Sequence, residues 1–107
     1  NKLNFSILDI YEIGKRLIIS WGTSFDACYN SIIKNSFYPL GLVNCLNYGH
    51  PEDSMGAFKE FVEDLTKKCR ENKVPIVGGN VSLYNATNNV SINPTPILVM
   101  VGIDKMQ

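Results

Sequence analysis

Two polar segments hold the residues whose types and spacing could bind a ligand. In the first, VPIVGGNVSLYN (residues 74–85), an apolar run meets Gly78 and Gly79 and continues through Asn80 and Ser82. Consecutive glycines let backbone N–H groups approach an oxyanion closely. An asparagine side-chain oxygen suits a hard cation such as Mg²⁺, and a serine hydroxyl suits a phosphate or a ring substituent. A glycine pair inside a strand is also often a simple bulge, and the local residues leave both interpretations open.

The second polar segment, NCLNYGHPE (residues 44–52), also follows an apolar run. A strand–helix–strand crossover joins the two segments, which predicts parallel strands with both segments at the same carboxyl edge of a sheet. Open sheets hold ligands at that edge. His50 is the only histidine, so these 107 residues hold no multi-histidine metal site, and we interpret His50 as a surface residue. Glu52 and Asp53 indicate the start of a helix.

Composition narrows the classes of function. A chain of 107 residues with 45% hydrophobic residues fits one small domain. Ten basic and ten acidic residues cancel, which argues against nucleic acid and membrane surfaces as partners. Three cysteines without C-x-x-C spacing favour small buried side chains in a reducing cytoplasm over a disulfide framework or a zinc site. The chain starts without methionine, and we interpret it as an excerpt of a longer polypeptide.

Hydrophobic periodicity predicts the order β-β-α-β-α-β-β, an α+β domain in which two helices pack on one face of a mixed sheet. The expected strands cover residues 3–10, 16–21, 40–46, 75–85 and 95–103, and the expected helices cover 24–37 and 54–72. We expect a turn over 11–15, in which Gly14 takes positive φ, and a loop over 86–94. Thr23 or Ser24 is the predicted N-cap of the first helix. Phe37 is expected on its apolar face, and Met55 on that of the second helix.

Residues of RLIISW and TPILVMVGI are expected to leave one sheet face apolar and exposed. An isolated domain of this kind is predicted to dimerise through that face.

Taken in order, NCLNYGHPE, a helix, VPIVGGNVSLYN and PTPILVMVG resemble the formylglycinamide ribonucleotide amidotransferase family, that is, the phosphoribosylformylglycinamidine synthases. The similarity covers about residues 25–103. The family belongs to the superfamily of aminoimidazole ribonucleotide synthetase, whose N-terminal domain binds ATP and pairs with a second such domain. The resemblance implies that residues 1–107 are a single ATP-binding and dimerisation domain, corresponding to the second of two tandem copies in a longer synthetase chain.

The resemblance also implies roles for individual residues. Asn44 and Gly79 would contact the nucleotide, Asn80 would ligate Mg²⁺, and Ser82 would contact formylglycinamide ribonucleotide. Asn44 stands where the family often has aspartate, so a charge is absent at that position, and His50 stands where asparagine is common. The family's active-site histidine, ATP-contacting lysine and acidic Mg²⁺ ligands match no motif here. No catalytic residue is therefore expected within these 107 residues.

The family reaction joins formylglycinamide ribonucleotide, ATP and glutamine-derived ammonia, and it yields the formylglycinamidine, ADP and phosphate in purine synthesis. The implied partners are the rest of the synthetase chain, a glutaminase subunit and a small accessory subunit. Two alternatives stay open. The chain could be a non-catalytic module that pairs sheets and holds a structural nucleotide. It could also be another superfamily member such as selenophosphate synthetase, although that family's reactive cysteine and glycine-rich N-terminal segment are not seen.

Overall fold

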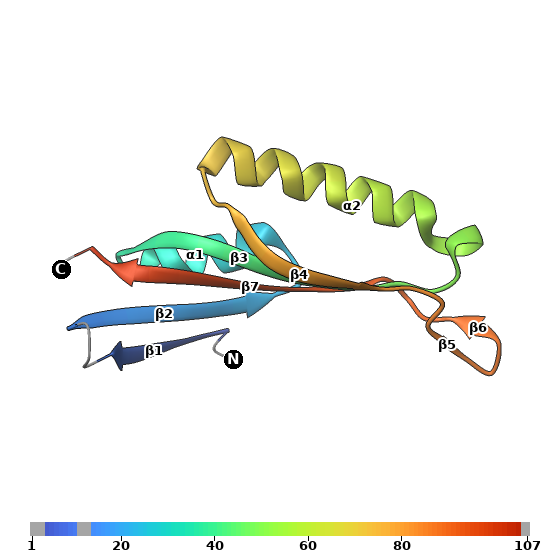
Figure 1. Ribbon diagram of the computed structural model, residues 1–107, viewed down its shortest axis with the longest axis horizontal. Helices are drawn as coiled ribbons and strands as arrows, with labels where there is room; N and C mark the ends of the chain where they lie inside the picture. The colour runs from blue at the N-terminus through green and yellow to red at the C-terminus, as the bar shows by residue number, and fades with distance from the viewer. Residues whose placement is uncertain (1–3, 11–13, 106–107) are drawn as a thin grey trace.

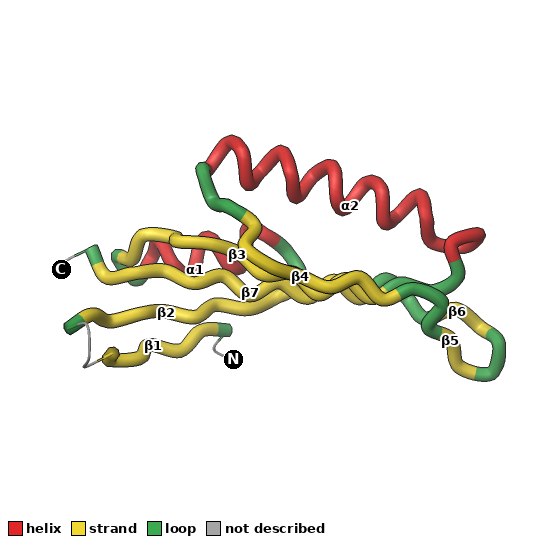
Figure 2. The backbone as a smooth tube through the Cα atoms, viewed as in Figure 1, coloured by secondary structure: helices red, strands yellow, loops and turns green. Residues whose placement is uncertain are grey.

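A mixed five-stranded sheet and two helices on one of its faces make up the fold, as the computed structural model shows for residues 4–10 and 14–105 (Figures 1 and 2). The strand order is β1-β2-β7-β3-β4, and β5 and β6 form a separate two-stranded hairpin. The elements are β1 (Phe5–Ile10), β2 (Lys15–Gly22), α1 (Phe25–Lys34), β3 (Phe37–Asn47), α2 (Pro51–Asn72), β4 (Ile76–Ser82), β5 (Ala86–Thr87), β6 (Val90–Ser91) and β7 (Thr95–Asp104). The predicted α+β class is confirmed.

The pairing of the strands follows the predicted pattern. Strands β1 and β2 form an antiparallel hairpin, β7 lies antiparallel between β2 and β3, and β3 pairs with β4 in parallel. Gly14 has a φ of 63°, as expected for the turn before β2. The expected turn at 11–13 and the expected strand start at Leu3 lie outside the described residues, and Lys15 already belongs to β2.

The core lies between the sheet and the helices. Strand residues at alternate positions point toward the helices and are fully buried, among them Ile18, Leu98 and Met100. Helix α1 covers them with Phe25, Cys28 and Ile32, and α2 contributes Leu65 and Cys69. Cys28 and Cys69 are buried, as predicted, and burial raises the pKa of both thiols. Cys45 is only half-buried, so the prediction of a buried side chain is wrong there.

Helix α1 begins where expected but ends early. Ser24 is the N-cap, and its hydroxyl accepts a hydrogen bond from the Ala27 N–H at 3.2 Å. The predicted extension of the helix to Phe37 is wrong, because Ser36 takes a φ of 65° and reverses the chain. Phe37 instead opens β3, where it is buried in the core. The strand therefore starts before the predicted residue 40 and includes Pro39, which the sheet accommodates at an irregularity in the β3–β7 pairing.

Helix α2 begins one turn before the predicted residue 54. Pro51 takes the first helical position, which suits a residue without an N–H. The placement of Met55 on the apolar face is wrong, since its side chain is 44% exposed. The inward face runs through Ser54, Phe58 and Leu65 at helical spacing, and Ser54 is accommodated there because its hydroxyl donates to the His50 carbonyl at 2.9 Å.

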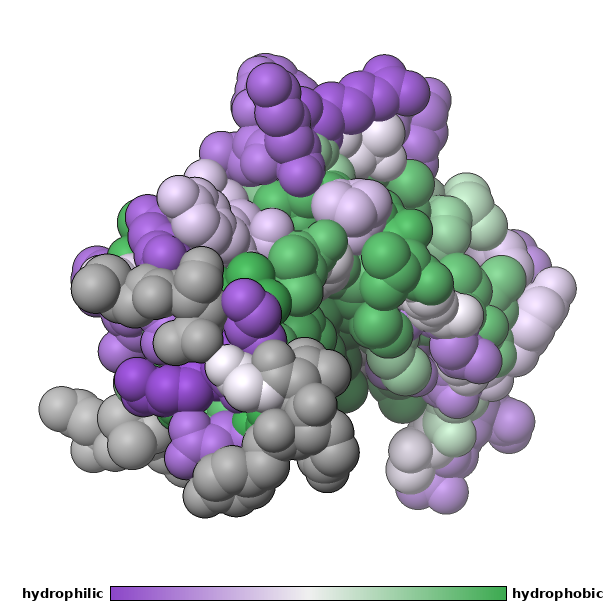
Figure 3. Space-filling view, turned by 60° about the vertical axis from the view of Figure 1, so that its left-hand side comes forward, coloured by the Kyte–Doolittle hydropathy of each residue, from purple (hydrophilic) through white to green (hydrophobic). Residues whose placement is uncertain are grey.

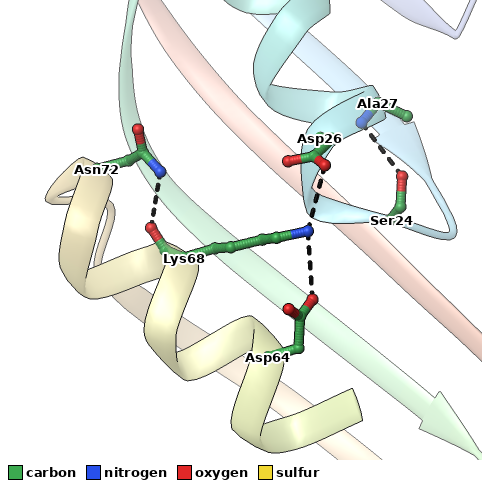
Figure 4. Close-up of polar contacts among 6 residues, drawn as sticks. All are labelled: Ser24, Asp26, Ala27, Asp64, Lys68 and Asn72. Atoms are coloured by element: carbon green, nitrogen blue, oxygen red, sulfur yellow. Dashed lines mark hydrogen bonds and ion pairs between the residues drawn. The ribbon is translucent and has the colours of Figure 1, made fainter. Parts of the chain in front are cut away.

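A lysine joins the two helices at the surface (Figure 4). Lys68 Nζ lies 3.2 Å from Asp26 Oδ2 on α1 and 3.3 Å from Asp64 Oδ2 on its own helix. The hydrogen bond to Asp26, followed by that to Asp64, raises the pKa of Lys68. Both carboxylates are largely exposed, so this contact orients the helices more than it stabilises them.

The two glycines of β4 meet different surroundings. Val77 is left unpaired where the β3–β4 register shifts, so a bulge is present, but it precedes the glycines. A Cβ added at Gly78 would meet no atom within 4 Å, whereas one at Gly79 would collide with Asn44 Oδ1 and lie 2.9 Å from the Asn44 carbonyl oxygen. Of these two positions, only position 79 requires glycine for packing.

The glycine pair predicts unequal responses to alanine. Gly79→Ala should lower the free energy of unfolding by about 1–3 kcal/mol, because the new methyl group meets backbone as well as a side chain. Gly78→Ala is the matched control and should leave stability nearly unchanged. Urea denaturation of the protein measures both, and equal losses for the two variants would contradict the packing argument.

Candidate functional site

The two polar segments lie side by side at the carboxyl ends of β3 and β4, as predicted. The parallel register places Asn44 beside Gly79, Cys45 beside Asn80, Leu46 beside Val81 and Asn47 beside Ser82. The strands end together, and the Tyr48 N–H donates to the Ser82 carbonyl at 2.8 Å. The expectation that the polar residues follow the strands needs correction. Residues 44–47 and 78–82 are the last part of each strand, and β4 ends at Ser82 rather than at residue 85.

The four predicted site residues share this edge but divide between its faces. Asn44 is paired with Leu98, a core residue, so Asn44 and Gly79 face the helices. Asn80 lies one residue on, so it and Ser82 face the opposite, open side of the sheet. Because β4 is an edge strand, a ligand lying along it could contact both sides. The structure thus brings the residues together in two pairs rather than in one cluster.

Asn80 suits the part of a single neutral metal ligand. Its side chain is exposed and makes no hydrogen bond within residues 4–10 and 14–105, which leaves the amide oxygen available. Among those residues no group of three or more His, Cys, Asp or Glu side chains could hold a metal ion. Mg²⁺ is commonly bound by one or two protein oxygens together with water and substrate phosphates. The residues present fit such a shared site but do not form a complete one.

Ser82 belongs to a hydrogen-bond network that the sequence did not reveal. The Asn85 side-chain amide donates to the Tyr48 carbonyl at 2.9 Å, the Ser82 carbonyl at 3.2 Å and the Ser82 hydroxyl at 3.0 Å. One side chain thus joins the ends of both parallel strands. The sequence signal for a role of Asn85 was only that it is a polar residue just after a strand. The turn that brings Asn85 back to Ser82 depends on Tyr84, which takes a φ of 63°.

The loop after β3 rests on a buried aromatic residue. Tyr48 is 1% exposed, and its ring meets that of Phe58 edge-on at 5.2 Å between centroids. Burial raises the pKa of the Tyr48 phenol. His50, predicted on the surface, is half-buried, with its ring 5.6 Å from that of Tyr84. The loop is therefore held from both sides rather than free in solvent.

The segment predicted as a loop over 86–94 contains a hairpin instead. Asn88 and Asn89 form its two-residue turn with φ of 52° and 65°, a backbone that asparagine tolerates better than most residues do. The Ser91 hydroxyl ties the hairpin to α2, since it accepts the His50 N–H at 2.9 Å and donates to Asp53 Oδ2 at 2.6 Å. Sequence periodicity does not detect strands of two residues.

Two grooves of the described surface lie elsewhere. One of about 390 Å³ includes Cys69, Val74, Pro75 and Ile76 in its lining, at the amino end of β4, and one of about 490 Å³ is lined by residues of α2. Ser82 is at the opposite end of that strand. Neither groove is lined by the four candidate residues, so we base the site on the chemistry and register of the strand ends.

Comparison with known proteins gives one family match and many relatives. The family model described as AIR synthase related protein, N-terminal domain, matches residues 2–103. Phosphoribosylformylglycinamidine synthase subunit PurL of Nitratiruptor sp. is 34% identical over 119 residues, covering 95% of this chain and 16% of that protein. The PurL subunit of Sulfurovum sp. is 35% identical over 122 residues, covering 98% and 16%. The chain thus spans only about 16% of the length of these relatives.

Comparison with solved structures finds proteins of the same kind as the sequence relatives. Thermotoga maritima PurL complexed with ADP matches with a TM-score of 0.76 and 25% identity, over 94% of this chain and 20% of that one. The same protein complexed with FGAR matches with a TM-score of 0.70 and 26% identity, over 84% and 18%. The family match over nearly the whole chain, the shared fold and the motif order lead to one assignment: this chain belongs to the AIR synthase related protein family, as an N-terminal domain.

Proposed function

We propose that this chain is part of a phosphoribosylformylglycinamidine synthase, the ligase that uses ATP to join glutamine-derived ammonia to formylglycinamide ribonucleotide. The observation that carries the proposal is the identity to PurL subunits over 95–98% of the chain. Thermotoga maritima PurL has been solved with ATP, with ADP and with FGAR. The contribution of this domain would be a ligand-contacting edge, formed by β3 and β4.

Each residue of that edge has chemistry suited to its proposed role. Gly79 is exposed and packs against Asn44 at this edge, so a nucleotide bound there could contact the Gly79 backbone and the Asn44 side chain together. Asn80 would supply a neutral oxygen to Mg²⁺, and Ser82 would contact formylglycinamide ribonucleotide. When bound, Mg²⁺ neutralises phosphate charge during phosphoryl transfer. The groups that perform the reaction would come from the rest of the synthetase.

The open face of the sheet supports the proposed domain partner. Trp21, Val99 and Val43 form a row across three strands on this face, and the side chains of Trp21 and Val43 are each 40% exposed. Figure 3 shows a broad apolar area on the surface of the molecule. A face of this kind fits the sheet of another such domain, or of a second copy of this chain when the domain is isolated.

The wider assembly and location follow from the same proposal. A relative has been solved as PurLQS from Thermotoga maritima, which matches over 94% of this chain and supports glutaminase and accessory subunits as partners. The three free cysteines favour a reducing cytoplasm. No helix in the described part of the chain is long and apolar enough to cross a membrane.

A second candidate is a non-catalytic domain that holds a structural nucleotide and pairs sheets. The neutral Asn44 favours it, as does the absence, within the described ranges, of a cluster of carboxylates that could complete a metal site. Both candidates place a nucleotide at the same edge. They differ in whether Asn80 affects turnover.

Replacement of Asn80 separates the two candidates. In the full-length synthetase, Asn80→Ala should raise the Mg²⁺ concentration for half-maximal activity by about tenfold or more, the scale typical of lost metal-site partners. Asn93→Ala, at another exposed asparagine without a side-chain hydrogen bond among the described residues, is the control. Unchanged turnover and Mg²⁺ dependence in Asn80→Ala would contradict the catalytic assignment and favour the structural nucleotide.

The apolar face predicts self-association of the isolated chain. Sedimentation of the 107-residue chain should show a dimer, and Trp21→Glu should shift it to monomer because a charge would have to be buried in the interface. Lys59→Glu, on the exposed side of α2, should leave the dimer intact. A monomer in the unsubstituted chain, or equal effects of both substitutions, would contradict pairing through this face.

A further inference from the structure

We infer that Asn85 is a positioning residue for Ser82, which it holds so that the hydroxyl donates its proton to an oxygen atom of the substrate. The inference rests on the proposed function of Ser82 as a substrate contact. It adds a residue to the site and specifies the chemistry of the group that Ser82 recognises: an acceptor oxygen such as that of a phosphate, a carbonyl or a sugar.

The Asn85 amide is anchored to a rigid part of the molecule. Its nitrogen lies 2.9 Å from the carbonyl oxygen of Tyr48, a residue that is 1% exposed and packed on Phe58. The backbone reinforces this position, because the Tyr84 N–H donates to the Gly49 carbonyl at 2.8 Å and the Asn85 N–H to the Tyr48 carbonyl at 3.2 Å. Asn85 is thus fixed against the end of β3 while it contacts the end of β4.

The donors and acceptors of this network leave one proton available. The Asn85 amide has two N–H groups and one oxygen. One N–H serves the Tyr48 carbonyl, and the other faces the Ser82 hydroxyl at 3.0 Å and the Ser82 carbonyl at 3.2 Å. The Ser82 oxygen therefore accepts from Asn85, and its own proton must find another acceptor.

Within the described chain that proton is weakly held. Its acceptor is Asn85 Oδ1 at 3.3 Å from Ser82 Oγ, well beyond the usual distance of about 2.7–2.8 Å for an O–H···O hydrogen bond. A ligand oxygen on the open face could accept the proton at a shorter distance. The hydrogen bond from the Asn85 N–H to Ser82 Oγ would keep the hydroxyl oriented toward that ligand. Ser82 lies on the same face as Asn80, two residues away, so the ligand would meet both.

A double-mutant cycle in the full-length synthetase tests the link between the two residues. Ser82→Ala should raise the KM for formylglycinamide ribonucleotide about tenfold, the value of one hydrogen bond in a binding site. Asn85→Ala should raise it by a similar factor. The double variant should be no worse than the more affected single variant, because both substitutions remove the same contact.

A second variant keeps the shape of the side chain and guards against loss of folding. Asn85→Asp removes the N–H donors and offers the Ser82 proton a carboxylate, so KM should rise at least as much as in Ser82→Ala. Asn93→Asp adds the same charge at an exposed position in a nearby loop and should leave KM unchanged. Thermal melting of each variant reports any structural damage separately.

The outcomes distinguish this inference from the proposal on which it rests. Asn85 variants that melt earlier but keep the normal KM, or effects on KM that multiply in the double variant, would overturn the positioning role and leave the function of Ser82 in place. An unchanged KM in Ser82→Ala would instead remove Ser82 from the substrate site, and the role of Asn85 with it.

Discussion

The parallel pairing of β3 with β4 is the constraint on which the rest of this structure depends. Helix α2 connects the two strands, so they must run in the same direction and end at the same edge. That pairing places Asn44 against Gly79, where any side chain larger than hydrogen would collide. It also brings Tyr48 next to Ser82, where Asn85 can bind both. The candidate site is therefore mainly a consequence of the crossover, to which the turn through Tyr84 adds Asn85.

The sequence predicted the architecture where long periodic patterns specify it. The apolar stripe of α2, the hairpin of β1 and β2 and the crossover were all visible. Errors arose where one residue could serve two elements. Phe37 continues the helical pattern of α1 but fills the core from β3, because Ser36 reverses the chain. The strands of the hairpin at Asn88 and Asn89 are too short to produce an alternating hydrophobic pattern in the sequence.

The shared edge of the four candidate residues was predicted, but their arrangement on that edge was not. The motif gave the residues, and the parallel crossover gave their common edge. Strand alternation alone puts Gly79 on the face opposite Asn80 and Ser82, but the pairing of Gly79 with Asn44 depends on the register, which shifts at the unpaired Val77. The contribution of Asn85 depends on the left-handed backbone at Tyr84. A left-handed conformation is uncommon for tyrosine, and no residue type in this segment marks the bulge at Val77, so neither feature follows from residue preference.

The central claim is that the edge strand β4 presents a nucleotide–metal site to which this domain contributes only part of the ligands. The most direct measurement is a crystal structure of the full-length protein with Mg²⁺ and a non-hydrolysable ATP analogue. The account predicts Mg²⁺ at about 2.1 Å from Asn80 Oδ1, with the nucleotide against the Gly79 backbone and the remaining protein ligands from outside these 107 residues. A nucleotide and metal bound elsewhere, with Asn80 and Gly79 left in solvent, would contradict it.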